Sequence, residues 1–506
     1  MNDQEKLGYL IKELRTRQGL TQQQFADMLQ TSQSAVARME AGQQNFSVKE
    51  LSKISDALEH PLINISENDS DDLIIEGGRK LSGSIQTNTS KNGAMGLLCA
   101  SLLNTKATTL HRIPRIEEVF RMIEVLESID VKVEWIDTHS LRITPPKIFD
   151  LTKLADGPAS KMRSTIMLIG SLVHHQKNFR LPHAGGCKMG ERSIGAHKHA
   201  LEELGIRITT EEEYYAIDAK GLAAGECTMY EASDTATENI LIAAAGIENG
   251  TTYIHFAQKN YMVQDVIGFL RRMGAVIEQH DPVTLRITGM GLIEYPLEYW
   301  NSEDPIESMA LLTAGIMTQS PITVTRCPID FLRLELLKLE KMGLGFELSG
   351  EYFSDNGFTK LVDITLKSFE LTALPDKIHP LPYPGINVDN LPFFVPIATQ
   401  AEGSTLIHDW MWENRAIYFT ELNRLGADIT LADPHRVFIE GKTLLKAAQI
   451  VCPPALRPSM IILLAMMGAE GTSTLRNVYS IKRGYENIHE RLNAIGANIQ
   501  FVKEIS

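Results

Sequence analysis

The sequence is short of features that define whole classes of protein. Its five cysteines, Cys99, Cys187, Cys227, Cys327 and Cys452, form no Cys-x-x-Cys pair, as expected of a protein in a reducing cytoplasm. It has no apolar run of about 18 residues and no signal-peptide pattern, so we expect a cytoplasmic protein without a membrane span. An excess of cations is also lacking, because the net charge is −14. This excludes a general nucleic-acid coat and leaves room for a small binding module.

The chain contains what a large soluble protein of several domains needs. Of its 506 residues, 43% are apolar and 22% are charged. Residues 66–72, reading SENDSDD, are acidic and lack any apolar side chain, which is typical of a linker. We therefore predict that residues 1–65 and the part from residue 73 onward fold separately.

Residues 7–58 have apolar side chains at helical spacing, which predicts a small all-α bundle. Thr21 caps a second helix with Gln24 in the capping-box position, Thr31 or Ser32 opens a third after a short turn, and Gly42 ends it. Two short helices joined in this way resemble the helix-turn-helix domains of phage repressors and Cro proteins.

That resemblance implies that residues 1–65 bind double-stranded DNA. The third helix would enter the major groove with Val36 and Met39 facing inward. Such modules usually read paired half-sites, so a homodimer is expected. The alternative is a helical bundle that docks another protein. The candidate DNA-binding residues are Gln22 on a phosphate and Gln33, Ser34 and Arg38 in the groove.

From residue 73 onward one pattern recurs: a helix of small and apolar residues, a turn, a strand, a second helix ending in Leu-Gly or a variant, and another strand. The period is roughly 65 to 85 residues, which favours small βαβ-type units over a solenoid. Nearly all-apolar first helices must be buried on every side, so three of them can form the centre of a domain. The predicted class is α/β (α+β), with first helices near Lys91, Met162, Thr237, Ile306, Leu391 and Pro458.

Short motifs in this part resemble the UDP-N-acetylglucosamine enolpyruvyl transferases (UDP-N-acetylglucosamine 1-carboxyvinyltransferases) of peptidoglycan synthesis. They are SKNGA from Ser90, GGCKMGER from Gly185, ATENI from Ala236, DPIE from Asp304, VDN from Val388, ENR from Glu413 and IKRGYENI from Ile481. The resemblance implies a two-domain fold of six repeated βαβ-type units. Its predicted halves are residues 73–90 plus 294–506, and residues 91–293 with the Cys187 loop.

The implied reaction moves the enolpyruvyl group of phosphoenolpyruvate to the 3-hydroxyl of UDP-N-acetylglucosamine and releases phosphate. It requires cations for a phosphate and a carboxylate, an acid for the methylene carbon and a base for the hydroxyl. By resemblance, Lys91, Arg192 and Arg415 hold phosphoenolpyruvate, and the other substrate-binding candidates are Asn92, Arg163 and Ser233.

Cys187 is the candidate general acid or covalent partner of phosphoenolpyruvate. It follows two glycines and precedes Lys188 and Arg192, a cationic setting that favours a thiolate. On the residues alone, a surface loop with one incidental cysteine is an equal alternative. The nearby histidines His183, His197 and His199 raise the question of zinc, but the resemblance implies neither a metal nor a cofactor.

Each of two aspartates has two possible roles, one catalytic and one as a helix cap. Asp304 is the candidate catalytic base, and it is also a good N-cap for a helix that starts at Pro305. Asp389 is either a helix cap or a second catalytic carboxylate. Lys91, in turn, is either a catalytic and substrate-binding cation or an ordinary lysine at a helix start.

The sequence departs from the family pattern on the nucleotide side. Residues 193–197 read SIGAH where the family usually has PVDLH, and Glu231 stands where a lysine is common. An acidic side chain near a diphosphate is unfavourable unless it is neutralised. Two alternatives therefore stay open: a transferase with another nucleotide-sugar acceptor, and a transcriptional regulator that senses a nucleotide sugar or phosphoenolpyruvate.

Overall fold

The computed structural model describes residues 11–12, 15–16, 20–29, 31–42, 53–54, 71–154, 159, 162–183 and 194–503. The chain divides into two compact units, residues 1–69 and residues 70–504. The predicted separation into 1–65, a linker and the remainder stays a prediction, although strand β1 (Asp71–Glu76) already begins inside the predicted linker. Asp71 pairs there with Lys503 across the sheet, so strand pairing outweighs its polar character.

The first unit contains the two predicted short helices, α2 (Gln22–Leu29) and α3 (Gln33–Glu40). The Thr21 hydroxyl accepts from the Gln24 amide at 3.2 Å and the Gln24 side chain accepts from the Thr21 amide at 2.8 Å. This reciprocal pair is the predicted capping box. Ser32 caps α3 by accepting from Ala35, and Gly42 follows with a φ of +67°. The predicted helix boundaries are confirmed.

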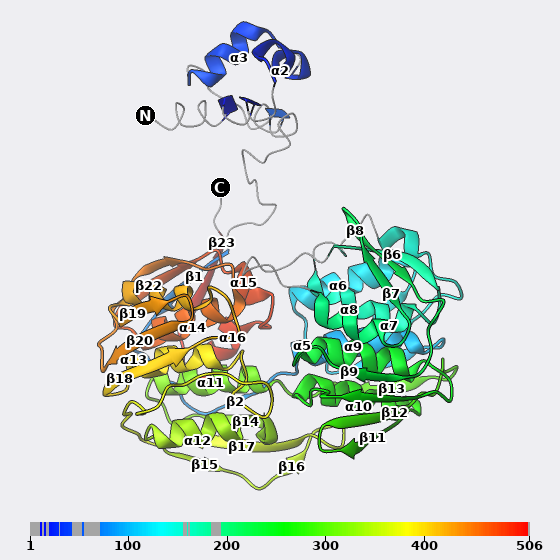
Figure 1. Ribbon diagram of the computed structural model, residues 1–506. Helices are drawn as coiled ribbons and strands as arrows, with labels where there is room; N and C mark the ends of the chain where they lie inside the picture. Colours follow the sequence, from blue (N-terminus) through cyan, green and yellow to red (C-terminus); the bar gives the residue numbers. More distant parts are fainter. Residues whose placement is uncertain are drawn as a thin grey trace. The chain divides into compact units, whose positions relative to one another are not determined.

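The second unit consists of repeated sheet and helix elements. Its described strands form six sheets, one for each predicted unit. Three sheets belong to one half of this unit, on the right in Figure 1, and lie around α5, α7 and α9. They are β13 (Leu297–Trp300), β3 (Thr108–His111), β5 (Leu141–Thr144) and β4 (Lys132–Trp135); β6 (Asn178–Pro182), β8 (Tyr214–Asp218) and β7 (Arg207–Thr210); and β11 (Val276–Asp281), β12 (Thr284–Thr288), β10 (Thr251–His255) and β9 (Glu226–Thr228).

The other three sheets surround α11, α13 and α14 in the second half. They are β21 (Gln449–Val451), β22 (Thr472–Arg476), β1 and β23 (Ile499–Lys503); β15 (Phe346–Leu348), β17 (Lys360–Leu366), β14 (Thr323–Pro328) and β2 (Ser84–Gln86), with β16 (Tyr352–Phe353) on β17; and β18 (Gly403–His408), β20 (Arg436–Gly441) and β19 (Asp428–Asp433). β13 pairs with β3 of the first half, so the strand pairing favours a crossing near residue 300. The predicted boundary at 293/294 stays a prediction.

The apolar first helices form the centre of each half, as predicted. α5, α7 and α9 pack on one another in one half, and α11, α13 and α14 do so in the other. Every residue of α11 is buried, which explains why its sequence has no polar stripe. The bounds are α5 (Lys91–Ala100), α7 (Ile169–Leu172), α9 (Asp234–Ala245), α11 (Pro305–Met317), α13 (Phe394–Thr399) and α14 (Leu456–Gly468).

The second helices of the units end in left-handed residues that release the chain into the next strand. In five units this residue is the predicted glycine: Gly205, Gly274, Gly343, Gly426 and Gly496; in the first unit it is Asp130 at φ +65°. Aspartate tolerates this conformation better than most side chains. These helices are α6 (Glu117–Ser128), α8 (Gly195–Glu202), α10 (Tyr261–Met273), α12 (Arg333–Lys341), the 3₁₀ helix η7 (Ala416–Leu425) and α16 (Ile488–Asn493).

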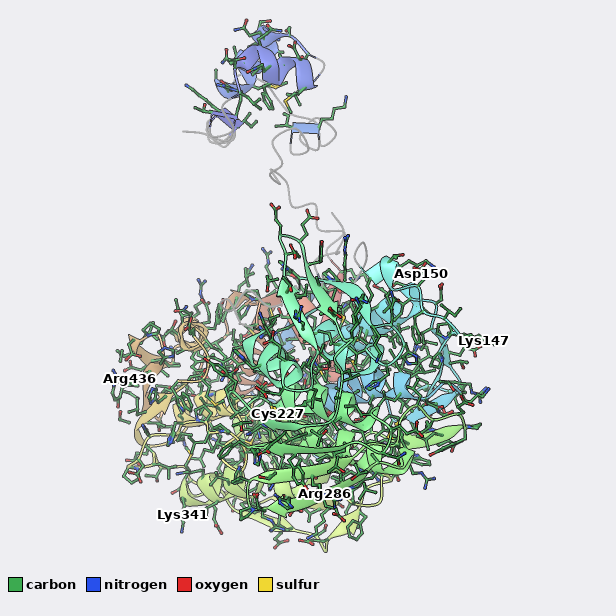
Figure 2. All side chains as sticks on the ribbon, turned by 45° about the vertical axis from the view of Figure 1, so that its right-hand side comes forward. Lys147, Asp150, Cys227, Arg286, Lys341 and Arg436 are labelled. Carbon is green, nitrogen blue, oxygen red and sulfur yellow. The ribbon has the colours of Figure 1, made fainter. Side chains whose placement is uncertain are left out.

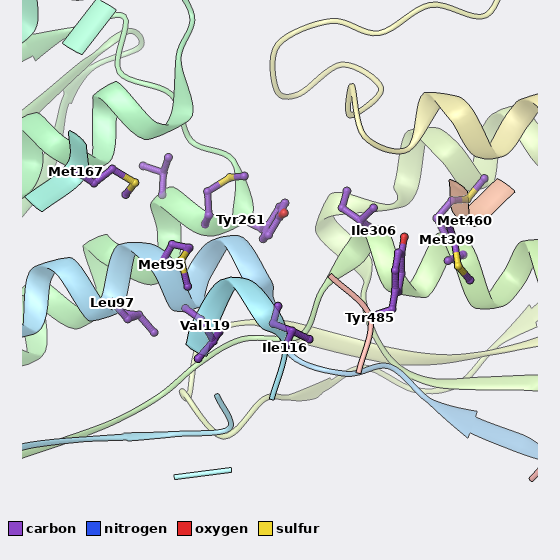
Figure 3. Packing of buried hydrophobic residues seen from close by; sticks show 14 of the residues in the cluster. Met95, Leu97, Ile116, Val119, Met167, Tyr261, Ile306, Met309, Met460 and Tyr485 are labelled. Atoms are coloured by element: carbon purple, nitrogen blue, oxygen red, sulfur yellow. The ribbon is translucent and has the colours of Figure 1, made fainter. Parts of the chain in front are cut away.

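Short helices complete the described elements, namely the 3₁₀ helices η1 (Ser101–Leu103), η2 (Leu151–Leu154), η4 (Arg163–Leu168), η5 (Ile329–Phe331) and η6 (Leu391–Phe393), and α15 (Tyr479–Lys482). The buried apolar side chains come from both halves, with Met95 and Val119 in one and Met309 and Met460 in the other (Figure 3). Charged residues such as Lys147 and Arg436 extend from the surface in Figure 2, whereas Cys227 is buried.

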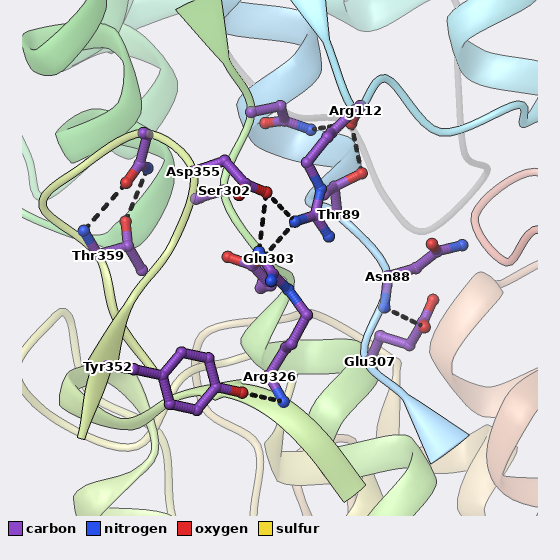
Figure 4. A network of polar contacts seen from close by, with 12 residues as sticks. Asn88, Thr89, Arg112, Ser302, Glu303, Glu307, Arg326, Tyr352, Asp355 and Thr359 are labelled. Carbon is purple, nitrogen blue, oxygen red and sulfur yellow. Dashed lines mark hydrogen bonds and ion pairs between the residues drawn. The ribbon is translucent and has the colours of Figure 1, made fainter. Parts of the chain in front are cut away.

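The chain passes between the halves along two neighbouring crossing segments, the first ending at Ser90 and the second at Asp304. The Ser90 amide donates to the Ser302 carbonyl at 2.7 Å, and the Asp304 amide donates to the Asn88 carbonyl at 2.9 Å. Beside them, Arg112 and Arg326 lie 3.0 and 2.6 Å from the buried carboxylate of Glu303 (Figure 4). This pairing brings the start of α5, at Lys91, next to the start of α11, at Asp304.

Candidate active site

Asp304 lies at the N-terminus of α11 where the second crossing segment ends. Its carboxylate accepts a hydrogen bond from the Ile306 amide at 2.8 Å, and Pro305 occupies the first helical position. The predicted N-cap is therefore confirmed. Burial raises the pKa of Asp304 to about 6; Arg457 opposes this shift, and Glu307 and Asp389 add to it. A carboxyl group with this pKa exchanges its proton near neutral pH, as a general base must.

Asp389 is held ionised by cations. Its carboxylate accepts two hydrogen bonds from Arg457, at 3.2 and 3.4 Å, and lies 3.7 Å from Arg415 Nη1. Burial by itself would raise the pKa of Asp389, but Arg457, Arg415 and Lys91 outweigh burial and lower it. The hydrogen bonds of this carboxylate go to side chains, so the geometry favours the second carboxylate over the helix cap.

Arg457 is the residue of this cluster that sequence reasoning missed. It lies in the first turn of α14 and is 5% exposed. Besides its bonds to Asp389, it donates to the Tyr485 hydroxyl at 2.9 Å, and it acts on the pKa of Asp304. The signal was present, since an arginine in an otherwise apolar helix needs a buried anion.

Arg415 lies behind Asp389 and is 1% exposed. It donates to both oxygens of Asp409, at 2.5 and 2.9 Å, and to the Val388 carbonyl at 2.8 Å. These bonds tie the arginine to the segment that carries Asp389. Arg415 therefore reaches the cluster from the protein interior.

Lys91 and Asn92 open α5 on the opposite side of the cluster. The Lys91 ammonium lies 2.5 Å from the carboxylate of Glu118. Asn92 donates to the hydroxyl of buried Tyr261 at 2.9 Å. In Figure 3, Tyr261 and Tyr485 lie at the facing edges of the two halves. The charge of Lys91 also contributes to the lowered pKa of Asp389.

A cavity of about 240 Å³ adjoins this cluster and is lined from both halves. Asp234 and Asn260 line it on one side, and Phe331, Tyr383 and Val388 line it on the other. Asn260 donates to Asp234 at 2.9 Å, and burial raises the pKa of Asp234 to about 6, with a contribution from Asp389. Val388 in this lining is the chain neighbour of Asp389, so the cavity lies beside the segment that carries this carboxylate.

The remaining predicted acceptor residues lie around the start of α9. Ser233 caps this helix by accepting from Ala236 at 3.3 Å. Burial lowers the pKa of Arg163, while Tyr215 and exposed Glu231 act in the opposite direction. The charge of Glu231 thus acts on Arg163 in the direction that favours the charged guanidinium.

The three histidines of this region have separate partners. Buried His197 contacts Thr235 and Asn239, each at 3.1 Å, and burial lowers its pKa to about 3. His199 stacks on Tyr230 and His183 lies against Tyr215. Among the described residues, no group of three or more histidine, cysteine, aspartate and glutamate side chains is placed to hold a metal ion.

Cys187 and Arg192 lie in residues 184–193, outside the described residues. The four described cysteines are buried: Cys99, Cys227, Cys327 and Cys452. Burial raises the pKa of each of these thiols above its ordinary value. A thiolate is the reactive form of cysteine, so these four are unsuited to catalysis at neutral pH.

The candidate DNA-reading residues lie together on one face of α3. Gln33, Ser34 and Arg38 are exposed, whereas Val36 and Met39 are 0% and 5% exposed, as predicted. Gln22 donates to Glu40 at 2.8 Å, and Glu40 accepts from buried Arg15 at 2.5 Å. The hydrogen bond between Gln22 and Glu40 therefore holds α2 against α3.

Comparison with known proteins identifies the larger unit. The family described as EPSP synthase (3-phosphoshikimate 1-carboxyvinyltransferase) matches residues 75–492. The chain belongs to the EPSP synthase family of enolpyruvyl transferases. Residues 11–62 match the helix-turn-helix family, so this transferase carries an N-terminal helix-turn-helix domain.

Two curated relatives of this enolpyruvyl transferase match over nearly their full length. UDP-N-acetylglucosamine 1-carboxyvinyltransferase of Bradyrhizobium diazoefficiens is 34% identical over 441 residues, covering 85% of this chain and 98% of the relative. The enzyme of the same name from Treponema denticola is 33% identical, covering 85% and 99%. The predicted kinship with these transferases is confirmed.

Solved structures share the fold of this enolpyruvyl transferase. The enolpyruvyl transferase NikO from Streptomyces tendae superimposes with a TM-score of 0.71 at 21% identity, covering 86% of this chain and 99% of that one. EPSP synthase from Acinetobacter baumannii gives 0.68 at 17% identity, with coverage of 86% and 100%. In the described part of the chain, no helix is long and apolar enough to cross a membrane.

Proposed function

We propose that this enolpyruvyl transferase moves the enolpyruvyl group of phosphoenolpyruvate to the 3-hydroxyl of UDP-N-acetylglucosamine and releases phosphate. The observation that carries the proposal is the pair Asp304 and Asp389. The pKa of Asp304 is raised to about 6 and that of Asp389 is lowered, and the neighbours of Asp389 at Asn387 and Val388 line a cavity that both halves form. Two carboxylates whose environments separate their pKa values are suited to different roles in one reaction.

In the addition step, Asp304 takes the proton of the acceptor hydroxyl, whose oxygen then bonds to C2 of phosphoenolpyruvate. Cys187 supplies the proton that C3 gains. In the elimination step the C2–O bond to phosphate breaks, and C3 returns its proton to Cys187, which restores the double bond. The proton held by Asp304 leaves with the released phosphate. The cations that hold the phosphate and carboxylate of phosphoenolpyruvate are Lys91, Arg192 and Arg415. Ionised Asp389 is the second carboxylate of the site and lies beside Arg415 and Arg457.

The N-terminal domain is proposed to bind double-stranded DNA through Gln22, Gln33, Ser34 and Arg38. Exposure of the last three on one face of α3 supports this, because a recognition helix must present its polar side chains to base edges. A homodimer would place two such helices on paired half-sites.

A different nucleotide-sugar acceptor is the second candidate. It is favoured by Asp234, which lines the cavity with a pKa of about 6, and by the exposed Glu231. Carboxylates on the acceptor side favour a ligand that offers hydrogen-bond donors there.

One assay tests both candidates. Phosphate release is measured with phosphoenolpyruvate and, in parallel, UDP-N-acetylglucosamine and other nucleotide sugars, with wild-type protein and Cys187→Ser. Release that requires UDP-N-acetylglucosamine supports the first candidate, and release with another sugar alone supports the second. Folded protein that releases phosphate with none of them, yet shifts an operator DNA only when a ligand is added, supports a sensing regulator instead.

A further inference from the structure

Glu118, in the first turn of α6, joins two cations that come from different halves. Its Oε2 lies 2.5 Å from Lys91 Nζ, and its Oε1 lies 2.6 Å from Arg483 Nη2. All three side chains are mostly buried, with 15% of Lys91, 15% of Glu118 and 25% of Arg483 exposed. Burial opposes the charge of Glu118, but Lys91 and Arg483 outweigh it and lower its pKa. Glu118 is thus a charged residue with a fixed place in the fold.

Lys91 has two carboxylates within its electrostatic reach. One is Glu118, with which it forms the ion pair, and the other is Asp389, whose pKa it lowers without a direct contact. A lysine ammonium on a flexible stem turns to whichever anion is nearest. Glu118, the carboxylate in direct contact, therefore fixes the position of the Lys91 ammonium group.

This arrangement leaves Lys91 able to bind a substrate anion. An ammonium group has three donors, so one hydrogen bond to Glu118 leaves two for a phosphate or carboxylate. Arg483 shares the charge of Glu118, so the three groups together carry a net positive charge. If Glu118 were absent, Lys91 would lose the contact that fixes its ammonium group.

Arg483 belongs to a segment that contacts the other half at several points. Glu486 accepts from the Arg115 amide at 2.9 Å and lies 2.9 Å from His139 Nε2, both in the other half. Within its own half, Tyr485 accepts from Arg457 at 2.9 Å. The ion pair of Arg483 with Glu118 is thus supported from both sides. A carboxylate held in this way is a rigid anchor for Lys91.

We propose that Glu118 is a positioning residue of the phosphoenolpyruvate site, which holds the Lys91 ammonium group in place for the substrate anion. The inference rests on the proposed function, because it assigns phosphoenolpyruvate as the anion. Glu118 itself does not contact the reacting atoms. Its role is exerted through Lys91.

The test measures binding of phosphoenolpyruvate to the full chain by titration calorimetry, with inorganic phosphate as a second probe, together with kcat and KM. Glu118→Gln is expected to weaken phosphoenolpyruvate binding about tenfold or more, the size expected when a charged hydrogen bond is lost. Glu118→Asp, which keeps the charge but withdraws it, is expected to weaken binding by less. The matched control is Glu117→Gln, which removes the neighbouring carboxylate that pairs with Arg121 at 3.0 Å, and it should leave binding unchanged.

A Lys91→Met background separates positioning from general damage to the fold. There Glu118→Gln should cause no further loss of phosphoenolpyruvate binding, since the anchored group is gone. Unchanged binding in a folded Glu118→Gln variant, or an equal loss with and without Lys91, would overturn the inference. If Glu118→Gln does not fold, unchanged phosphoenolpyruvate binding in Glu118→Asp would overturn the inference instead. Wild-type protein that binds phosphoenolpyruvate but transfers nothing refutes the proposed function alone, and wild-type protein that does not bind it refutes both.

Discussion

Asp389 and Arg457, 68 residues apart in the chain, are joined by two hydrogen bonds of 3.2 and 3.4 Å to one carboxylate oxygen. The same guanidinium donates to Tyr485 and acts on the pKa of Asp304. One buried cation therefore influences both candidate catalytic carboxylates. Burial raises the pKa of both carboxyls, but Arg457, Arg415 and Lys91 together outweigh it at Asp389, whereas at Asp304 Glu307 and Asp389 add to burial and Arg457 opposes it.

Loss of Arg457 should destabilise the protein strongly. Arg457→Gln leaves Asp389 with a weaker set of partners, and breaking a buried ion pair costs roughly 3 kcal/mol in the free energy of unfolding. Because the folded-state pKa of Asp389 is lowered, its contribution is present above the unfolded pKa and is lost as pH falls through the folded value. The destabilisation, measured by urea unfolding, should therefore be largest near neutral pH and smaller in acid. Arg436→Gln, which breaks an exposed pair with Asp433, is the control and should cost less than about 1 kcal/mol.

Asp304→Asn should separate the two roles of Asp304. Asparagine caps helices about as well as aspartate, so thermal stability should be retained. It cannot accept a proton as a base, so kcat should fall by about 10²- to 10⁴-fold. In the wild type, kcat should rise with pH through about 6 as Asp304 ionises. An Asn variant with wild-type kcat would exclude Asp304 as the base.

The folded-state pKa of Asp304, about 6, lies above that of an unfolded aspartate, about 3.9. Its contribution to stability is therefore present below the unfolded value and is lost as pH rises through about 6. The free-energy difference between wild type and Asp304→Asn should shift in favour of Asn as pH rises from 4 to about 7. A difference that does not depend on pH would contradict the raised pKa.

Thiol labelling should distinguish Cys187 from the other cysteines. Four thiols are buried with raised pKa values, so they should react slowly with iodoacetamide at neutral pH. We expect one rapidly modified residue, Cys187, in mass spectra of the native protein. Rapid modification of Cys99, Cys227, Cys327 or Cys452 would contradict the burial of that thiol. Urea-unfolded protein, in which all five should react, is the control.

DNA binding should depend on the exposed face of α3. Arg38→Ala is expected to weaken binding of an operator fragment and, if it contacts a phosphate, to reduce the salt slope by about one. Gln33→Ala should relax the preference for one base pair, at a cost of about 1 to 3 kcal/mol in discrimination. Lys53→Ala, exposed outside α2 and α3, is the control in a gel-shift titration. Equal effects of all three variants would favour a docking surface for protein over a recognition helix.

Local signals predicted much of the fold. Some features depend only on residues that are close in the sequence, so they could be predicted from it. They are the capping box of Thr21 and Gln24, the N-cap at Asp304 and the left-handed glycines. The six apolar helices could also be read, since a helix buried on all sides has no polar stripe. The start of strand β1 at Asp71 could not be predicted, because this strand is stabilised by pairing across a sheet, where Asp71 lies opposite Lys503.

The site was predicted less completely than the fold. Asp304, Asp389, Lys91 and Arg415 were predicted from motifs. The pairing of the two crossing segments brings Lys91 next to Asp304, and Asp389 lies 3.7 Å from Arg415. Arg457 and Glu118 were missed because their roles depend on partners far along the chain, Asp389 and Arg483. An isolated arginine or glutamate in a helix has no local pattern that names its partner.

The central claim is tested most directly by identifying the product. Purified protein is incubated with phosphoenolpyruvate and UDP-N-acetylglucosamine, and the sugar nucleotide is analysed by mass spectrometry beside Asp304→Asn. The account predicts a sugar nucleotide that gains one carboxyvinyl group, formed in step with released phosphate and largely absent with the variant. Folded wild-type protein that leaves the sugar nucleotide unmodified, or an equal yield from Asp304→Asn, would contradict it.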